Sequence, residues 1–60
     1  MGYGLMTIDN LRTERRILLR EDARLRREGY HFDSEARVAI HRQVQEVSKM
    51  LKFKKHLASL

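Results

Sequence analysis

Leucine recurs at a spacing of seven in the first half of the chain, and each of these leucines is followed three residues later by glutamate. The copies are Leu11-Arg12-Thr13-Glu14, Leu18-Leu19-Arg20-Glu21 and Leu25-Arg26-Arg27-Glu28. Apolar residues at spacings of three and four lie on one face of an α-helix, and a period of seven is typical of helices that pack along a seam. The pattern predicts a helix over residues 8–28 that buries a leucine face.

Local signals define the ends of this helix. Thr7 precedes it as an N-cap, because its side-chain oxygen can accept a hydrogen bond from a free backbone N–H, and Asp9 brings negative charge to the first turn. Gly29 can adopt the left-handed conformation that ends helices in a Schellman motif, with Tyr30 as the next residue. We therefore expect a turn over residues 29–33 and a flexible N-terminal arm over residues 1–7.

The remainder of the chain predicts a second helix over residues 34–59, since no Pro or Gly follows Gly29. Asp33 or Ser34 is its expected N-cap. Its apolar residues follow the alternating spacing of four and three, interrupted only by Lys54, namely Ile40, Val44, Val47, Leu51 and Ala58. A linker as short as residues 29–33 makes consecutive helices antiparallel neighbours. The expected fold is an all-α antiparallel two-helix hairpin over residues 8–60.

The second predicted helix carries more apolar residues than a two-helix hairpin can bury. The surplus forms another stripe, made of Ala39, Met50, Phe53, Leu57 and Leu60. With 60 residues and no cysteine, the chain has a small core and no disulfide to support it. We therefore expect self-association, in the form of a homodimer in which two hairpins make a four-helix bundle.

Two charged residues, Arg15 and Asp22, share the leucine face of the first predicted helix. Burial of either charge alone is costly. One hypothesis is an antiparallel pairing of two copies of this helix around Leu18, which brings Arg15 of one chain toward Asp22 of the other. The alternative is that both residues lie at the edge of the seam, in contact with solvent.

The chain is basic, with 13 Lys and Arg against 8 Asp and Glu and a net charge of +5. Arginines form a stripe along the first predicted helix, and lysines of the second add to it: Arg12, Arg16, Arg20, Arg24, Arg27, Lys52 and Lys55. Such a surface is typical of contact with phosphate groups or acidic proteins. The alternative is a solvated face neutralised by nearby carboxylates, through pairs such as Glu21 with Arg24 and Asp22 with Arg26.

Exposed aromatic and apolar residues are the other candidates for binding, because such side chains dominate interface energies. They are Tyr30, Phe32, Met50, Phe53 and Leu57. We expect a small non-enzymatic regulatory or adaptor protein that binds another protein through an apolar helix face flanked by basic residues. The alternative is binding to the backbone of RNA or DNA by a dimeric basic helical bundle.

Motifs for catalysis and metal binding are missing from the sequence. His31, His41 and His56 do not have the spacing of three or four that helical metal ligands need, and there is no glycine-rich phosphate loop and no cysteine nucleophile. We therefore expect no enzymatic activity, no cofactor and no metal. The segment 49–57 is basic and amphipathic, but no second anchor accompanies it, so we do not expect a membrane partner. We expect a cytoplasmic location, with which the lack of cysteine is compatible.

At the level of the fold, this layout resembles two kinds of small hairpin protein. One is the two-helix proteins that dimerise into four-helix bundles and bind structured RNA in plasmid copy control, with which the chain shares no motif. The other is the aspartyl-phosphate phosphatases of sporulating bacteria. Their Ser-Gln-Glu-Leu-Asp motif is missing, since the chain reads His41-Arg42-Gln43-Val44-Gln45-Glu46. We carry over no residue and no activity from either.

Overall fold

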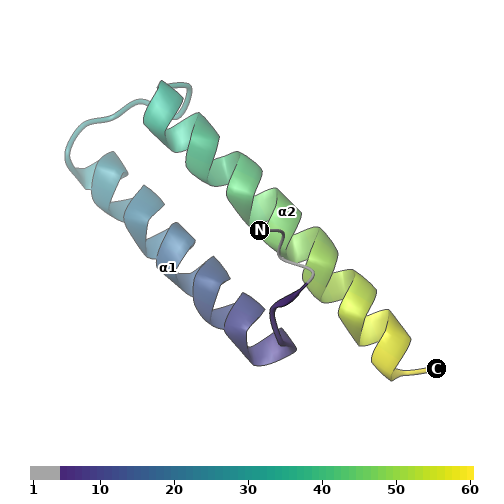
Figure 1. Cartoon of the computed structure of the whole chain (residues 1–60). Helices are drawn as coiled ribbons and strands as arrows, with labels where there is room; N and C mark the ends of the chain where they lie inside the picture. Colours follow the sequence, from purple (N-terminus) through teal and green to yellow (C-terminus); the bar gives the residue numbers. More distant parts are fainter. Residues whose placement is uncertain (1–4) are drawn as a thin grey trace.

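Two α-helices joined by a tight turn make up the computed structural model, which describes residues 5–60 (Figure 1). Helix α1 covers Ile8–Arg27 and helix α2 covers Glu35–Ala58. They pack side by side and run in opposite directions (Figure 1), which confirms the predicted all-α hairpin. Glu28, Ser34 and Ser59, which the sequence pattern assigned to the helices, are cap residues.

Both ends of α1 have the cap structures that the sequence predicts. At the start, the backbone N–H of Asn10 donates a hydrogen bond to Thr7 Oγ1 over 3.1 Å. At the other end, Gly29 has a φ of 95°. The N–H of Gly29 donates to the carbonyl of Arg26 at 3.1 Å, and the N–H of Tyr30 donates to the carbonyl of Leu25 at 3.0 Å. These two hydrogen bonds define a Schellman motif.

The start of α2 differs from the expectation of a side-chain cap. Ser34 occupies the N-cap position, but its side chain makes no capping hydrogen bond. Its Oγ is buried and has no hydrogen-bond partner among residues 5–60. The carboxylate of Asp33 instead lies 2.5 Å from His31 Nδ1. The helix begins through its backbone, with the N–H of Val38 donating to the carbonyl of Ser34 at 2.9 Å.

The core lies along the seam between the helices and is small. Its buried cluster consists of Leu11, Leu18, Val47 and Leu51, of which Leu11 and Val47 are completely buried. The partly buried hydrophobic residues around it are Met6, Ile8, Ile40, Val44 and Met50. Leu25 is also buried, so all three leucines of the heptad repeat face inward as predicted. Met6 and Thr7 of the predicted arm are therefore in contact with the fold, whereas residues 1–4 lie outside the described residues.

Much of the second apolar stripe is exposed in the single chain. Phe53 is 55% exposed, Leu57 is 49% exposed and Leu60 is 87% exposed. The last turns of α2 extend beyond the beginning of α1 (Figure 1). The hairpin therefore leaves one side of α2 without an intramolecular partner.

No helix among the described residues combines the length and the apolar character that crossing a membrane requires.

Candidate functional site

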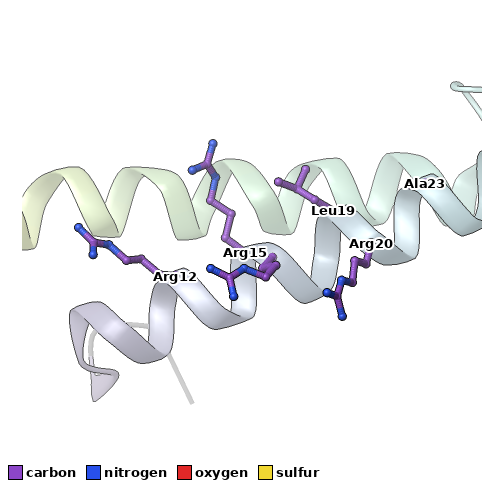
Figure 2. A pocket seen from close by; sticks show the side chains of 6 residues that line it. Arg12, Arg15, Leu19, Arg20 and Ala23 are labelled. Carbon is purple, nitrogen blue, oxygen red and sulfur yellow. The ribbon is translucent and has the colours of Figure 1, made fainter.

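Two adjoining hollows lie on one side of the hairpin and share Arg15. The larger has a volume of about 520 Å³ and lies along α1, lined by Arg12, Arg15, Arg16, Leu19, Arg20 and Ala23 (Figure 2). The smaller, of about 230 Å³, lies between the helices and is lined by Arg15, Ser48, Leu51, Lys52 and Lys55. Neither lining includes an acidic residue. We call the six cations of these hollows the basic face: Arg12, Arg15, Arg16, Arg20, Lys52 and Lys55.

The heptad repeat explains why the glutamates of α1 lie away from the hollows. Residues three and four positions after a buried leucine lie on opposite flanks of the helix seam. From Leu11, these positions hold Glu14 and Arg15, and from Leu18 they hold Glu21 and Asp22. Because the hollows lie on the Arg15 flank, the glutamates face the other side of the hairpin. Figure 2 shows the Arg15 side chain extending from α1 toward α2, which brings it near the lysines of α2.

Ion pairing neutralises only part of the predicted arginine stripe. Arg24 pairs with Glu21, as expected, and also with Glu28 at 3.5 Å. These carboxylates raise the pKa of Arg24 above its ordinary value. Across residues 5–60, no cation of the basic face forms an ion pair, and neither does Arg27. Within residues 5–60, the pairing of Glu21 with Arg24 is as expected, whereas Arg12, Arg16 and Arg20 form no ion pair.

Asp22 has a different partner from those that the sequence suggested. It accepts hydrogen bonds from Arg37 on α2, from Nε at 2.8 Å and from Nη2 at 3.3 Å. His41 Nε2 also lies 3.1 Å from Asp22 Oδ1. The expected pairing of Asp22 with Arg26 is therefore wrong. Since both carboxylate oxygens are engaged within the chain, the hypothesis of a pairing with Arg15 of a second copy loses its premise.

The hydrogen bond from Arg37 is the main cause of a lowered pKa at Asp22, partly opposed by burial of the carboxylate. Arg37 Nη1 also donates to the carbonyl of Tyr30 at 3.2 Å. Sequence reasoning missed Arg37, although a signal was present: it precedes Ile40 by three residues and so continues the inward-facing spacing of α2. A cation on that stripe needs a carboxylate on the facing helix, and Asp22 supplies it.

The five predicted protein-binding residues do not form one surface. Tyr30 and Phe32 belong to the turn, with 48% and 63% of their surfaces exposed. Met50, Phe53 and Leu57 lie on the C-terminal half of α2, beginning about 20 Å along the helix axis from its start. Met50 is half-buried against the core cluster, whereas Phe53 and Leu57 are exposed. The α2 trio and the turn pair are therefore separate candidate surfaces.

Two of the histidines each lie beside one aspartate. His31 lies beside Asp33, and His41 lies beside Asp22. Within residues 5–60, no group of three or more His, Cys, Asp or Glu side chains is arranged to hold a metal ion.

Comparison with protein-family models, with curated proteins and with solved structures finds no match to this chain.

Proposed function

We propose that this protein binds the phosphate backbone of a nucleic acid through the basic face. The observation that carries the proposal is the pair of adjoining hollows, which are lined by six cations and no acidic residue. Within the described residues none of these cations has a carboxylate partner. Clustered cations without partners create a positive potential that attracts a polyanion.

The arrangement of the arginines suits contact with consecutive phosphates. Arg12, Arg16 and Arg20 follow one another at intervals of four residues, which corresponds to about 6 Å along a helix axis. Each guanidinium can donate two parallel hydrogen bonds to a phosphate group. Backbone contacts of this kind carry no base sequence information. The proposal is therefore sequence-independent binding, with DNA and RNA both within its scope.

The protein-adaptor function remains a second candidate. It is favoured by the exposure of Phe53 and Leu57, at 55% and 49%. We rank it second because its turn residues and its α2 residues lie at opposite ends of α2, whereas the basic face is continuous through Arg15. The two candidates use different sides of the hairpin and can be separated by mutation.

Fluorescence anisotropy with a labelled random-sequence DNA duplex and a labelled single-stranded RNA tests the proposal. We expect binding at low salt and a linear fall of log affinity with log salt concentration, with a slope of about −0.9 for each duplex phosphate neutralised. The variant with Arg15→Gln, Arg16→Gln and Arg20→Gln should lose most of this affinity. Phe53→Ala should retain it, because Phe53 lies outside both hollows.

A matched charge control is Arg42→Gln, since Arg42 is exposed on α2 and lines neither hollow. Comparing it with Arg20→Gln holds the loss of charge constant and changes only the position. Equal losses of affinity from the two variants would show diffuse attraction and contradict the basic face as the site. Absence of binding to both nucleic acids at low salt would overturn the proposal and favour the protein-adaptor candidate.

A further inference from the structure

The larger hollow has an apolar floor between its arginines. Leu19 lines the hollow and is 46% exposed, and the exposed Ala23 lies one helical turn further along α1. We call these two residues the apolar floor. At about 100° of rotation per residue, Arg15 lies on one side of Leu19 around the helix, and Arg16 and Arg20 lie on the other. Figure 2 shows Leu19 between Arg15 and Arg20 along the helix.

Contacts with phosphate groups do not account for the apolar floor. A phosphate oxygen accepts hydrogen bonds from guanidinium groups, and an apolar side chain donates none. The flat face of a nucleobase, in contrast, packs against apolar side chains and against guanidinium planes. The volume of the hollow, about 520 Å³, lies within the range of about 300–1,000 Å³ that is common for sites that hold small organic groups. The larger hollow thus combines groups that bind phosphates with a surface that suits a base.

We propose that the larger hollow binds single-stranded nucleic acid, with unpaired bases packed on Leu19 and Ala23 and the phosphates bound by the surrounding arginines. The inference rests on the proposed function and names its substrate class. In a duplex the bases are stacked inside the double helix, and their faces become accessible only when a base leaves the stack. Only a single strand can therefore place base faces on the apolar floor without first breaking base pairs.

The charges around the apolar floor favour a polyanion as the occupant. Within residues 5–60, none of the four arginines that line the larger hollow forms an ion pair. Asp22 follows Leu19 by three residues, but both oxygens of its carboxylate accept hydrogen bonds from Arg37. A strand that lies along α1 would therefore meet positive charge on both sides of the apolar floor.

Electrostatic attraction alone predicts the opposite preference. A DNA duplex carries one negative charge per about 1.7 Å of its axis, which is a higher charge density than that of a single strand. Each phosphate that is neutralised accordingly contributes about 0.9 to the salt slope on a duplex and about 0.7 on a single strand. Tighter binding of a single strand than of a duplex therefore requires contacts in addition to those with phosphate groups.

Fluorescence anisotropy with labelled oligothymidylate, free and annealed to oligoadenylate, tests the inference with the same labelled strand in both probes. We expect the free strand to bind more tightly than the duplex at the same salt concentration. Leu19→Ala should weaken binding of the free strand about fivefold, because it removes part of the apolar area that a base would cover. The slope of log affinity against log salt concentration should stay the same, since no charge is removed. Binding of the duplex should be unchanged.

The matched control is Ile17→Ala. Ile17 is a similarly exposed apolar residue of α1, at 54%, and lines neither hollow. This variant should bind both probes like the wild type. Leu19→Phe tests the same position by a gain of affinity, because an aromatic ring gives a base a stacking surface, and it should bind the free strand more tightly than the wild type. Circular dichroism of the three variants reports whether the helices are retained.

The outcomes separate this inference from the proposed function. Tighter binding of the duplex, or equal affinities of Leu19→Ala and Ile17→Ala for the free strand, would overturn the inference. If Arg20→Gln still weakened binding in that case, the proposed function would stand, with the basic face binding phosphates alone. Absence of binding to both probes at low salt would overturn the inference and the proposed function together.

Discussion

Asp22 of α1 and Arg37 of α2 hold the turn end of the hairpin together through two hydrogen bonds, at 2.8 and 3.3 Å. Only 16% of the Asp22 side chain and 11% of the Arg37 side chain are exposed. The same guanidinium also donates to the carbonyl of Tyr30. One ion pair thus joins both helices and the turn.

Stability should depend on pH through Asp22. Its pKa lies below the ordinary value of 3.8, mainly because of the hydrogen bond from Arg37. A carboxyl group whose pKa is lowered by folding stabilises the folded state at all pH values above its unfolded pKa. That contribution is lost as the pH falls through the lowered pKa. Thermal unfolding should therefore show a higher midpoint for the wild type than for Asp22→Asn at neutral pH, and the difference should shrink in acid below pH 3.8.

Removing the positive charge of Arg37 should lower the thermal stability of the hairpin more than removing an exposed positive charge elsewhere on α2. Arg37→Gln should lower the thermal midpoint, because it leaves the mostly buried Asp22 carboxylate without its main partner. Arg42→Gln removes the same charge from an exposed position on the same helix and should leave the midpoint nearly unchanged. Similar midpoints for both variants would show that the Asp22 bridge contributes little to the fold.

Replacing Gly29 should destabilise the fold through the backbone conformation of the turn and not through a steric clash. An added Cβ would meet no atom within 4 Å, but the φ of 95° is one that L side chains rarely adopt. Gly29→Ala should cost about 1–2 kcal/mol in the free energy of unfolding. Gly29→Asn should cost less, because asparagine tolerates the left-handed region better. Urea denaturation followed by circular dichroism measures both.

Two leucines of α1 provide a direct test of the core assignment. Leu11 is completely buried, whereas Leu19 is 46% exposed in the larger hollow. Leu11→Ala should lower the free energy of unfolding by about 2–5 kcal/mol, which is a large fraction of the stability of so small a domain. Leu19→Ala should change it by about 0.5 kcal/mol or less. The same denaturation experiment would contradict the heptad assignment if the two losses were equal.

The slope of log affinity against log salt concentration should report how many phosphate groups the basic face neutralises. Each arginine that neutralises one phosphate contributes about 0.9 to the slope of log affinity against log salt on duplex DNA. Replacing Arg16 by Gln should therefore reduce the magnitude of the slope by about 0.9. Arg24→Gln should reduce it less, because Glu21 and Glu28 already pair with this arginine. Anisotropy titrations at several salt concentrations give both slopes.

Most of the hairpin could be predicted from periodicity and cap residues. The leucine repeat and Gly29 are local signals, because burial along a helix repeats with the helix period and a left-handed cap needs a residue without a Cβ. The side chain of Ser34 shows the limit of local reasoning. It has the right type and position for an N-cap, yet its hydroxyl makes no capping hydrogen bond. Residue type alone does not fix the side-chain orientation.

The candidate site was predictable only in part, because it depends on how two helices face each other. Arg12, Arg16 and Arg20 could be assigned to one stripe from the sequence of α1 alone. That Arg15 joins this stripe to Lys52 and Lys55 depends on the rotation of α2 about its axis, which the spacing within either helix does not give. The partner of Asp22 was missed for the same reason, since Arg37 lies 15 positions away.

The separation of the α1 glutamates from the cations of the two hollows also has a consequence at long range. Glu14 and Arg15 leave the seam on opposite sides, and the hollows lined with cations lie on the arginine side. The cations of the hollows are thus gathered on one side of the hairpin, away from Glu14. A polyanion would attract this cationic side before contact, which raises the fraction of collisions that meet the basic face.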